Sequence, residues 1–220
     1  MTSAQASATL PDRVGTTSRA SSLAAALVAP AVMIVILAIS LLLLMTPIWM
    51  HFALVAAWAP GGDPSFGLAL SDKTVWEIFV GPGTFSAFGV DEAGHMRDVR
   101  LVFWGFMALA MASLGLILWR VLRHGHEART WRSISRGGVA LAVILVIVGP
   151  LALLFFDSAF ELFHRIFFPG GNFSFPPDSL LIILYPFAFW QISASALGAL
   201  GVIGGLLIWF FARRRALESA

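Results

Sequence analysis

Four long apolar segments constrain this chain more than any other feature. They run over residues 23–45, 101–122, 137–156 and 187–211. A bilayer core of about 30 Å needs about 20 helical residues, so each segment is long enough to cross it once. A water-soluble domain of 220 residues that is 59% hydrophobic could not bury so much apolar surface. The sequence therefore predicts an all-α membrane protein with four transmembrane helices.

Arginine dominates the basic residues and gathers at one end of the predicted bundle. Of the 14 basic residues only Lys73 is a lysine. Arginines precede the first span, fill the link between the second and third spans, and follow the fourth. The positive-inside rule places these segments in the cytoplasm, so both termini are predicted to be cytoplasmic. The arginines then mark topology, and no nucleic-acid partner is expected.

The predicted domain plan has three parts. Residues 1–22, rich in Ser, Thr and Ala, are expected to form a disordered cytoplasmic tail. Residues 23–212 form the four-span membrane domain, and residues 213–220 a basic cytoplasmic tail. The outward segments 46–100 and 157–186 hold most of the acidic residues and many Trp and Phe residues, which suit the bilayer interface. We expect these two segments to fold as an extracytoplasmic cap of short amphipathic helices and loops.

One histidine of the cap stands among charged residues just before the second span. In "DEAGHMRDVR", residues 91–100, His95 lies three positions after Glu92 and three before Asp98. On a helix, side chains at this spacing are neighbours, so a carboxylate can reach the imidazole from either side. A carboxylate beside an imidazole fixes its tautomer and raises its basicity. The simpler explanation is that these charges mark the polar end of a membrane helix.

A second histidine follows the third span in a similar setting. In "DSAFELFHRIFFPGGN", residues 157–172, Asp157, Glu161 and His164 fall at i, i+4 and i+7 of the predicted helix that leaves the span. This spacing places all three on one helical face. An imidazole with an ordinary pKa of about 6.5 can accept and return a proton near neutral pH. Each outward segment thus offers one candidate acid–base histidine.

Other chemistries have weaker support. A metal site could combine His95 and His164 with Asp157 and Glu161, but no H-x3-H or H-E-x-x-H pair is present. No G-x-S-x-G motif supports a serine nucleophile, and the chain has no cysteine. We therefore expect neither a metal nor another cofactor.

Three stretches resemble the motif blocks of an integral membrane family long known as domain of unknown function 1461. They are "LALSDKTVWEIFVG", "DEAGHMRDVR" and "FELFHRIFFPGGNFSFPPDSLLIILYPFAFW". The characterised member of this family is a lipoprotein intramolecular transacylase. The resemblance implies an acyltransferase that takes the sn-2 acyl chain of a diacylglyceryl-modified lipoprotein. The acceptor is the α-amine of the lipoprotein's N-terminal cysteine, and the product is a lyso-form lipoprotein.

The resemblance also implies the place of action and the two main residues. The family's essential histidines fall on His95 and His164, and the active face lies on the outer side of a bacterial cytoplasmic membrane. The implied partners are the lipid bilayer and the lipoprotein substrate. Phe173 and Phe187 depart from the family pattern, where we expect Trp and an acidic residue.

For such a reaction we expect further residues to support the histidines. Orienting or electrostatic support is assigned to Glu92, Asp98, Asp157, Glu161, Arg97, Arg165 and Asn172. Asp72 is predicted to cap a loop helix at its N-terminus, and Asp178 is assigned to loop structure.

Two other functions remain compatible with the sequence. A non-catalytic membrane scaffold would leave His95 and His164 far apart in different environments. An outer-leaflet lipid hydrolase, or an acyltransferase with another acceptor, would differ only in what attacks the ester. Oligomeric state and acyl-chain preference are not encoded in any recognisable pattern.

Overall fold

A computed structural model describes residues 14–58 and 64–219, and these residues form helices and loops without a strand. The helices are α1 (Val14–Leu44), α2 (Pro47–Ala57), α3 (Ser65–Phe79), α4 (Val90–His124), α5 (Ala128–Leu154), α6 (Phe156–Phe167), α7 (Leu180–Leu184) and α8 (Phe187–Glu218). Four of them, α1, α4, α5 and α8, are long and apolar enough to cross a membrane. The prediction of an all-α protein with four candidate membrane spans is confirmed.

The long helices extend beyond the predicted spans. The first helix begins at Val14, before the predicted start of the span at residue 23; residues 1–13 of the predicted tail lie outside the described residues. At the other terminus α8 continues through the basic segment. The guanidinium groups of Arg213 and Arg214 lie over the rings of Trp209 and Phe210, one helical turn earlier. These cation–π contacts favour helix in a segment that the sequence assigned to a tail.

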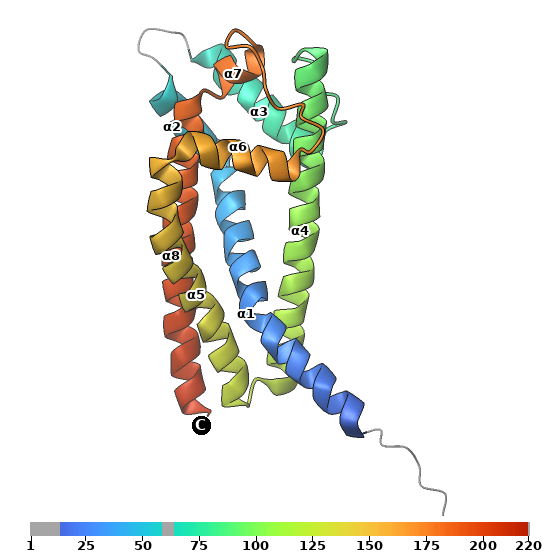
Figure 1. Ribbon diagram of the computed structural model, residues 1–220, viewed down its shortest axis with the longest axis vertical. Coiled ribbons are helices and arrows are strands. Elements are labelled where there is room, and N and C mark those ends of the chain that lie inside the picture. Colours follow the sequence, from blue (N-terminus) through green and yellow to red (C-terminus); the bar gives the residue numbers. More distant parts are fainter. Residues whose placement is uncertain (1–13, 59–63, 220) are drawn as a thin grey trace, which may run out of the picture.

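The four long helices stand side by side, and the four short ones gather at one end of the bundle (Figure 1). The cap, defined here as α2, α3, α6, α7 and the loops that join them, therefore forms a separate layer from the spans. The start of α1 and the end of α8 lie at the opposite end. This end also carries the link between α4 and α5.

Close helix packing inside the bundle depends on glycine. A Cβ added to Gly138 of α5 would collide with the carbonyl oxygen of Gly205 on α8, and the reverse is equally true. Gly137 meets the backbone of Ala29 on α1 in the same way. Small residues at such contacts let membrane helices approach until their backbones touch, which gives α1, α5 and α8 a common packed interface.

Two buried clusters stabilise the two halves of the molecule. The cluster under the cap joins α2, α3 and α7 to the adjoining parts of α4 and α8, and it includes Leu54, Phe85, Met96, Leu184 and Phe189. The cluster in the opposite half includes Val28, Val32, Ile36, Ile134, Leu141 and Ala212. Large apolar side chains elsewhere on the long helices are exposed, as expected for surfaces that face lipid acyl chains.

The chain bends sharply between the third span and the helix that carries His164. The span ends at Leu154, Phe155 takes a non-helical conformation (φ −112°, ψ 43°), and α6 begins at Phe156. Figure 1 shows α6 crossing the bundle instead of continuing along α5. One side of α6 is polar, with Asp157, Glu161 and Arg165 exposed, so it is suited to lie at the membrane surface.

Candidate functional site: a buried histidine pair beneath the cap

The two candidate histidines lie side by side, although they come from different outward segments. The ring centroids of His95, near the start of α4, and His164, near the end of α6, are 5.9 Å apart, with 26° between the ring planes. Both are buried, with exposed fractions of 6% for His95 and 8% for His164. The fold thus brings together the two residues that the sequence singled out.

Glu92 fixes the start of α4, and its partners differ from those that the sequence predicted. Its Oε2 accepts a hydrogen bond from the Gly89 backbone N–H at 2.7 Å, and its Oε1 accepts one from the Leu181 backbone N–H at 2.8 Å. The first bond caps α4, and the second ties α4 to α7. Both carboxylate oxygens are therefore occupied by backbone donors. The prediction that Glu92 orients the His95 ring is corrected to a role in positioning the backbone on which His95 stands.

The loop between α3 and α4 is held by a second buried glutamate. Glu77 of α3 accepts hydrogen bonds from the Thr84 backbone N–H at 3.0 Å and from the Thr84 hydroxyl at 3.3 Å. Phe85, which follows Thr84, is buried and has a positive φ of 50°, a backbone conformation that is uncommon for residues other than glycine. From α4, Arg100 Nη1 donates to the Gly81 carbonyl at 2.9 Å. These bonds set the direction in which α4 leaves the cap.

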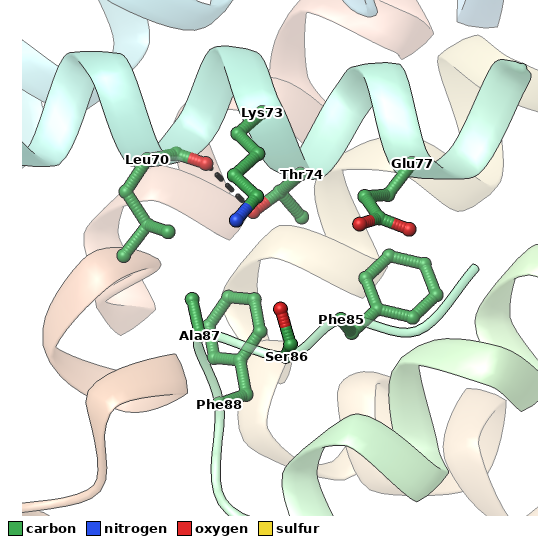
Figure 2. A pocket seen from close by; sticks show the side chains of 8 residues that line it. All are labelled: Leu70, Lys73, Thr74, Glu77, Phe85, Ser86, Ala87 and Phe88. Carbon is green, nitrogen blue, oxygen red and sulfur yellow. Dashed lines mark hydrogen bonds between the residues drawn. The ribbon is translucent and has the colours of Figure 1, made fainter. Parts of the chain in front are cut away.

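A small pocket lies between α3 and this loop. Figure 2 shows side chains of α3 facing those of the loop across it; the lining residues are Leu70, Lys73, Thr74, Glu77, Phe85, Ser86, Ala87 and Phe88. Neither His95 nor His164 lines it. Its space suffices for about one water molecule, so it is a packing defect of the loop and not a substrate site.

His164 is oriented by a backbone carbonyl. Its Nδ1 lies 2.8 Å from the carbonyl oxygen of Phe160, one turn earlier in α6. Because a carbonyl can only accept, Nδ1 carries the proton, and Nε2 of the neutral ring keeps a free lone pair. Burial lowers the pKa of His164 below its ordinary value, and the bond to Phe160 opposes this in part. The ring is therefore a neutral base at neutral pH.

The carboxylates predicted to orient His164 point elsewhere. Glu161 pairs with Arg165 on the exposed side of α6, with 2.6 Å between Oε1 and Nη2. Asp157 is exposed. Although Asp157, Glu161 and His164 follow the predicted helical spacing, His164 turns inward while the two acids remain at the surface. The prediction of a carboxylate partner for His164 is corrected to the Phe160 carbonyl.

Phenylalanine rings surround the histidine pair. The His164 ring lies 4.1 Å from Phe160, 5.5 Å from Phe168 and 5.3 Å from Phe173, measured between centroids. The His95 ring lies 4.7 Å from Phe168 and 5.6 Å from Phe175. From the sequence such rings were expected at the bilayer interface, and this enclosure was not predicted. The missed signal is the four-residue spacing of Phe160, His164 and Phe168, which repeats on one helical face.

Of the remaining support residues, two contact each other and two lie at the surface. Asn172 Nδ2 donates to Asp98 Oδ2 at 2.6 Å, which joins the loop after α6 to α4. Arg97 is exposed on α4, and Arg165 is exposed on α6. The structure therefore brings Asp98 and Asn172 together beside the pair and leaves both arginines at the surface.

The two aspartates assigned to loop structure have different positions. Asp72 is not an N-cap, because α3 begins at Ser65 and Asp72 lies inside the helix. Its Oδ1 instead lies 2.8 Å from Nε2 of His51, which ties α3 to α2. The sequence could not show this contact because the two residues are not at helical spacing. Asp178 is exposed in the loop before α7.

The arrangement is suited to proton transfer rather than to nucleophilic attack by the protein. His164 offers the Nε2 lone pair, and His95 Nδ1 is buried without a hydrogen-bond partner among residues 14–58 and 64–219. Within the same described ranges, neither ring is hydrogen-bonded to a serine or threonine hydroxyl, and no group of three or more potential ligands could hold a metal ion.

Comparison with known proteins supports the fold and places the chain in a family. In the in meso structure of the lipoprotein intramolecular transacylase Lit from Bacillus cereus, 98% of the chain matches 93% of this one, with a TM-score of 0.66 and 16% identity. A second structure of that protein, with a histidine-to-arginine mutation, matches 93% of this chain and 96% of its own, with a TM-score of 0.61 and 14% identity. At this identity the likeness concerns the fold alone.

A sequence relative and a family match complete the comparison. An uncharacterized protein of Aquifex aeolicus (strain VF5) is 28% identical over 125 residues, and the match spans 56% of each chain, so this chain aligns with little more than half of that relative. The family described as lipoprotein intramolecular transacylase Lit matches residues 79–190, about half of the chain, and this range includes His95 and His164. The chain is a member of the Lit family of membrane proteins.

Proposed function

We propose that the chain is an intramolecular transacylase of the Lit type. It would move the sn-2 acyl chain of a diacylglyceryl-modified lipoprotein to the α-amine of the N-terminal cysteine. The observation that carries this proposal is the pairing of His95 and His164 at 5.9 Å inside an aromatic enclosure. Membership of the Lit family supports the choice of substrate.

The parts of the site match the needs of this reaction. The substrate supplies its own nucleophile, an α-amine with an ordinary pKa of about 7.7–8.0, so the enzyme needs no serine or cysteine of its own. The amine and the ester belong to one molecule, and an intramolecular attack has a high effective concentration. The protein therefore has to hold the reactive geometry and move one proton.

His164 is the proposed base and His95 the proposed electrophile. The substrate amine attacks the ester carbonyl carbon, and His164 Nε2 takes the proton that the amine loses. His95 donates a hydrogen bond to the carbonyl oxygen as negative charge develops there. When the bond between the carbonyl carbon and the glyceryl oxygen breaks, His164 returns the proton to that oxygen. An amide forms, a hydroxyl is left at sn-2, and both rings end as they began.

Burial of the pair favours the amine over water. Because Phe168 and the two histidines are each less than a tenth exposed, few water molecules can reach the ester when the substrate fills the site. This supports a transacylase over a lipid hydrolase. A scaffold protein would have no use for two imidazoles 5.9 Å apart, so the geometry also supports an enzyme over a scaffold.

The cap is proposed to lie on the outer face of a bacterial cytoplasmic membrane. Side chains of α6 divide into an exposed apolar flank with Leu162, Ile166 and Phe167, and an exposed polar flank with Glu161 and Arg165. Such a helix is suited to the boundary between acyl chains and head groups. Arginines gather at the opposite end of the bundle, which the positive-inside rule assigns to the cytoplasm.

The proposal is tested by mass spectrometry of a lipoprotein's N-terminal peptide. The host should lack other lipoprotein N-acyltransferases and should carry the wild-type chain, no chain, or the His164→Ala variant at equal expression. We expect an N-acyl, S-monoacylglyceryl peptide only with the wild-type chain.

Each alternative has its own product. A free amine on an S-monoacylglyceryl peptide would identify a hydrolase. An unchanged diacylglyceryl peptide with a free amine, despite folded wild-type protein, would rule out action on lipoproteins. Product formed at the wild-type level by His164→Ala would remove His164 from the mechanism.

A further inference from the structure

The segment that joins α6 to α7 forms a roof over the histidine pair. This roof segment, residues 168–181, contributes Phe168 and Phe175 against the His95 ring and Phe173 against the His164 ring. It has no long helix or strand of its own. With the roof segment in this position both imidazoles are less than a tenth exposed. The site described here is closed.

Two carboxylates of α4 hold the roof segment, one on either side of His95. Glu92, one turn before His95, binds the Leu181 backbone N–H at the end of the roof. Asp98, one turn after His95, accepts from Asn172 near the beginning of the roof at 2.6 Å. Because both acids share a helix with His95, they fix where the roof rings lie relative to the imidazole.

The two attachments differ in strength. Glu92 is buried and has a second backbone partner at Gly89, and α7 behind it is further fixed by the bond from Trp58 Nε1 to the Leu184 carbonyl at 3.2 Å. The bond between Asp98 and Asn172 is exposed. Hydrogen bonds in water-exposed positions open more easily than buried ones. The Asn172 end of the roof can therefore detach while the Leu181 end stays in place.

The backbone next to Asn172 is suited to such a movement. Gly170 and Gly171 precede it, Gly171 has a φ of +76°, and a Cβ at either glycine would meet no neighbouring atom within 4 Å. Glycine crosses between backbone conformations with little steric resistance. A hinge at this pair lets Asn172 and Phe173 swing outward without disturbing α6.

We propose that the roof segment is a lid over the histidine pair, that Asp98 and Asn172 form its latch, and that Glu92 holds its fixed end. Asp98 is then a positioning residue that acts through the lid and not on the imidazole directly. This inference rests on the proposed function, because a substrate with two acyl chains and a peptide cannot reach the buried rings unless the lid opens. Latching afterwards places Phe173 and Phe175 against the reacting groups and excludes water.

The latch is tested without reference to activity by hydrogen–deuterium exchange of the protein in lipid nanodiscs. In Asn172→Ala we expect the amides of residues 170–175 to exchange about three- to tenfold faster, since the variant loses one hydrogen bond to a charged group. The double variant Asp98→Asn/Asn172→Asp exchanges donor and acceptor and should restore protection. Asp91→Asn is the control for the Asp98→Asn change in the double variant, because Asp91 is exposed in the first turn of the same helix and loses the same charge. Unchanged exchange in Asn172→Ala would overturn the latch.

A second measurement asks whether the latch serves the reaction. In Asn172→Ala we expect kcat to fall at least about threefold with a smaller change in KM, and the exchanged pair to recover most of the loss. Faster exchange with an unchanged kcat would overturn the positioning role. If the wild-type chain yields no transacylation product, the proposed function fails, and the exchange data still decide whether the lid and its latch exist.

Discussion

Histidines occur near acidic residues at both ends of the bundle, but their side-chain contacts differ. In the link between α4 and α5, His124 Nδ1 lies 2.7 Å from Glu127 Oε1, three residues later, and Arg120 Nη2 lies 3.6 Å from Glu127 Oε2. Beneath the cap, His95 and His164 have no carboxylate within hydrogen-bond distance and lie against each other and against phenylalanine rings. Imidazole–carboxylate pairs thus exist in the link and, at His51 and Asp72, on the exposed side of the cap, but neither candidate histidine belongs to one.

The difference shows what each environment can do with an imidazole. Glu127 is at the surface, and its hydrogen bond with His124 lowers the pKa of the Glu127 carboxyl. Burial instead lowers the pKa of His164 and keeps its ring neutral. A neutral imidazole keeps a lone pair that can accept a proton, and a site that excludes water keeps that lone pair available to the substrate. Enclosure, and not the presence of a carboxylate, separates the candidate active site from the link.

The difference between the enclosed site and the α4–α5 link is tested most directly by replacing one histidine in each. We expect His164→Ala to lower the rate of lyso-form lipoprotein formation by about 100-fold or more, because the variant loses its general base. His124→Ala should keep the rate within about twofold of wild type. Both rates are measured with purified protein in nanodiscs and a diacylglyceryl peptide, followed by mass spectrometry. Equal losses in the two variants would show that they act through stability and not through chemistry.

The sequence predicted the membrane architecture well because lipid imposes simple rules. Runs of about 20 apolar residues mark helices in any membrane protein, and the four candidate spans lie where such runs occur. It also singled out His95 and His164 from five histidines, because both stand in outward segments next to acidic residues. Helical periodicity alone could not show that α4 and α6 would meet.

The side-chain partners were predicted less well, for a physical reason. Positions i, i+3 and i+4 are close on any helix, but a helix whose one face is buried sends neighbouring side chains into different surroundings. Along α6, His164 turns toward the core while Glu161 stays at the surface with Arg165. Glu92 is buried, and tertiary packing supplies backbone donors from residues that no local pattern identifies, such as Leu181. Contacts that depend on such packing cannot be read from spacing.

A second comparison concerns the glutamates at the two ends. Glu92→Ala leaves two backbone N–H groups of the cap without an acceptor, so we expect the free energy of unfolding to fall by about 2–4 kcal/mol. Glu127→Ala breaks only surface contacts and should cost much less. Denaturant unfolding in detergent micelles, followed by tryptophan fluorescence, compares the two. A smaller effect for Glu92→Ala than for Glu127→Ala would contradict the structural role of Glu92.

His164 and Glu127 should affect the free energy of unfolding in different pH ranges. Between the lowered pKa of folded His164 and its ordinary value of 6.5, the unfolded chain binds more protons, so stability falls as the pH drops through that window. Glu127, whose folded pKa lies below 4.5, contributes stability that is lost only as the pH falls further, through its own lowered value. We expect His164→Gln to reduce the first loss and Glu127→Gln the second, in stability measured from pH 3 to pH 8.

The same shift sets the acid limit of the reaction. Protonation of the substrate amine, with its ordinary pKa of about 7.7–8.0, already lowers kcat/KM below that pH. If His164 is the base, a second decline should follow only below pH 6.5, because burial lowers the pKa of His164. The profile is measured with the rate assay used for the histidine variants. If the second decline instead has its midpoint at or above 6.5, the His164 ring is not shielded from water as the burial of its side chain implies.

Substitution of Glu161 has the smallest expected effect, and it tests whether a carboxylate acts on the enclosed His164. Its ion pair with Arg165 is exposed on α6, so Glu161→Gln should change the rate by no more than about twofold and the stability by at most about 0.5 kcal/mol. A loss of tenfold or more, with stability unchanged, would mean that Glu161 leaves Arg165 and turns to His164 once the lid opens. The enclosed site would then acquire during the reaction the same imidazole–carboxylate pair that the link between α4 and α5 keeps permanently.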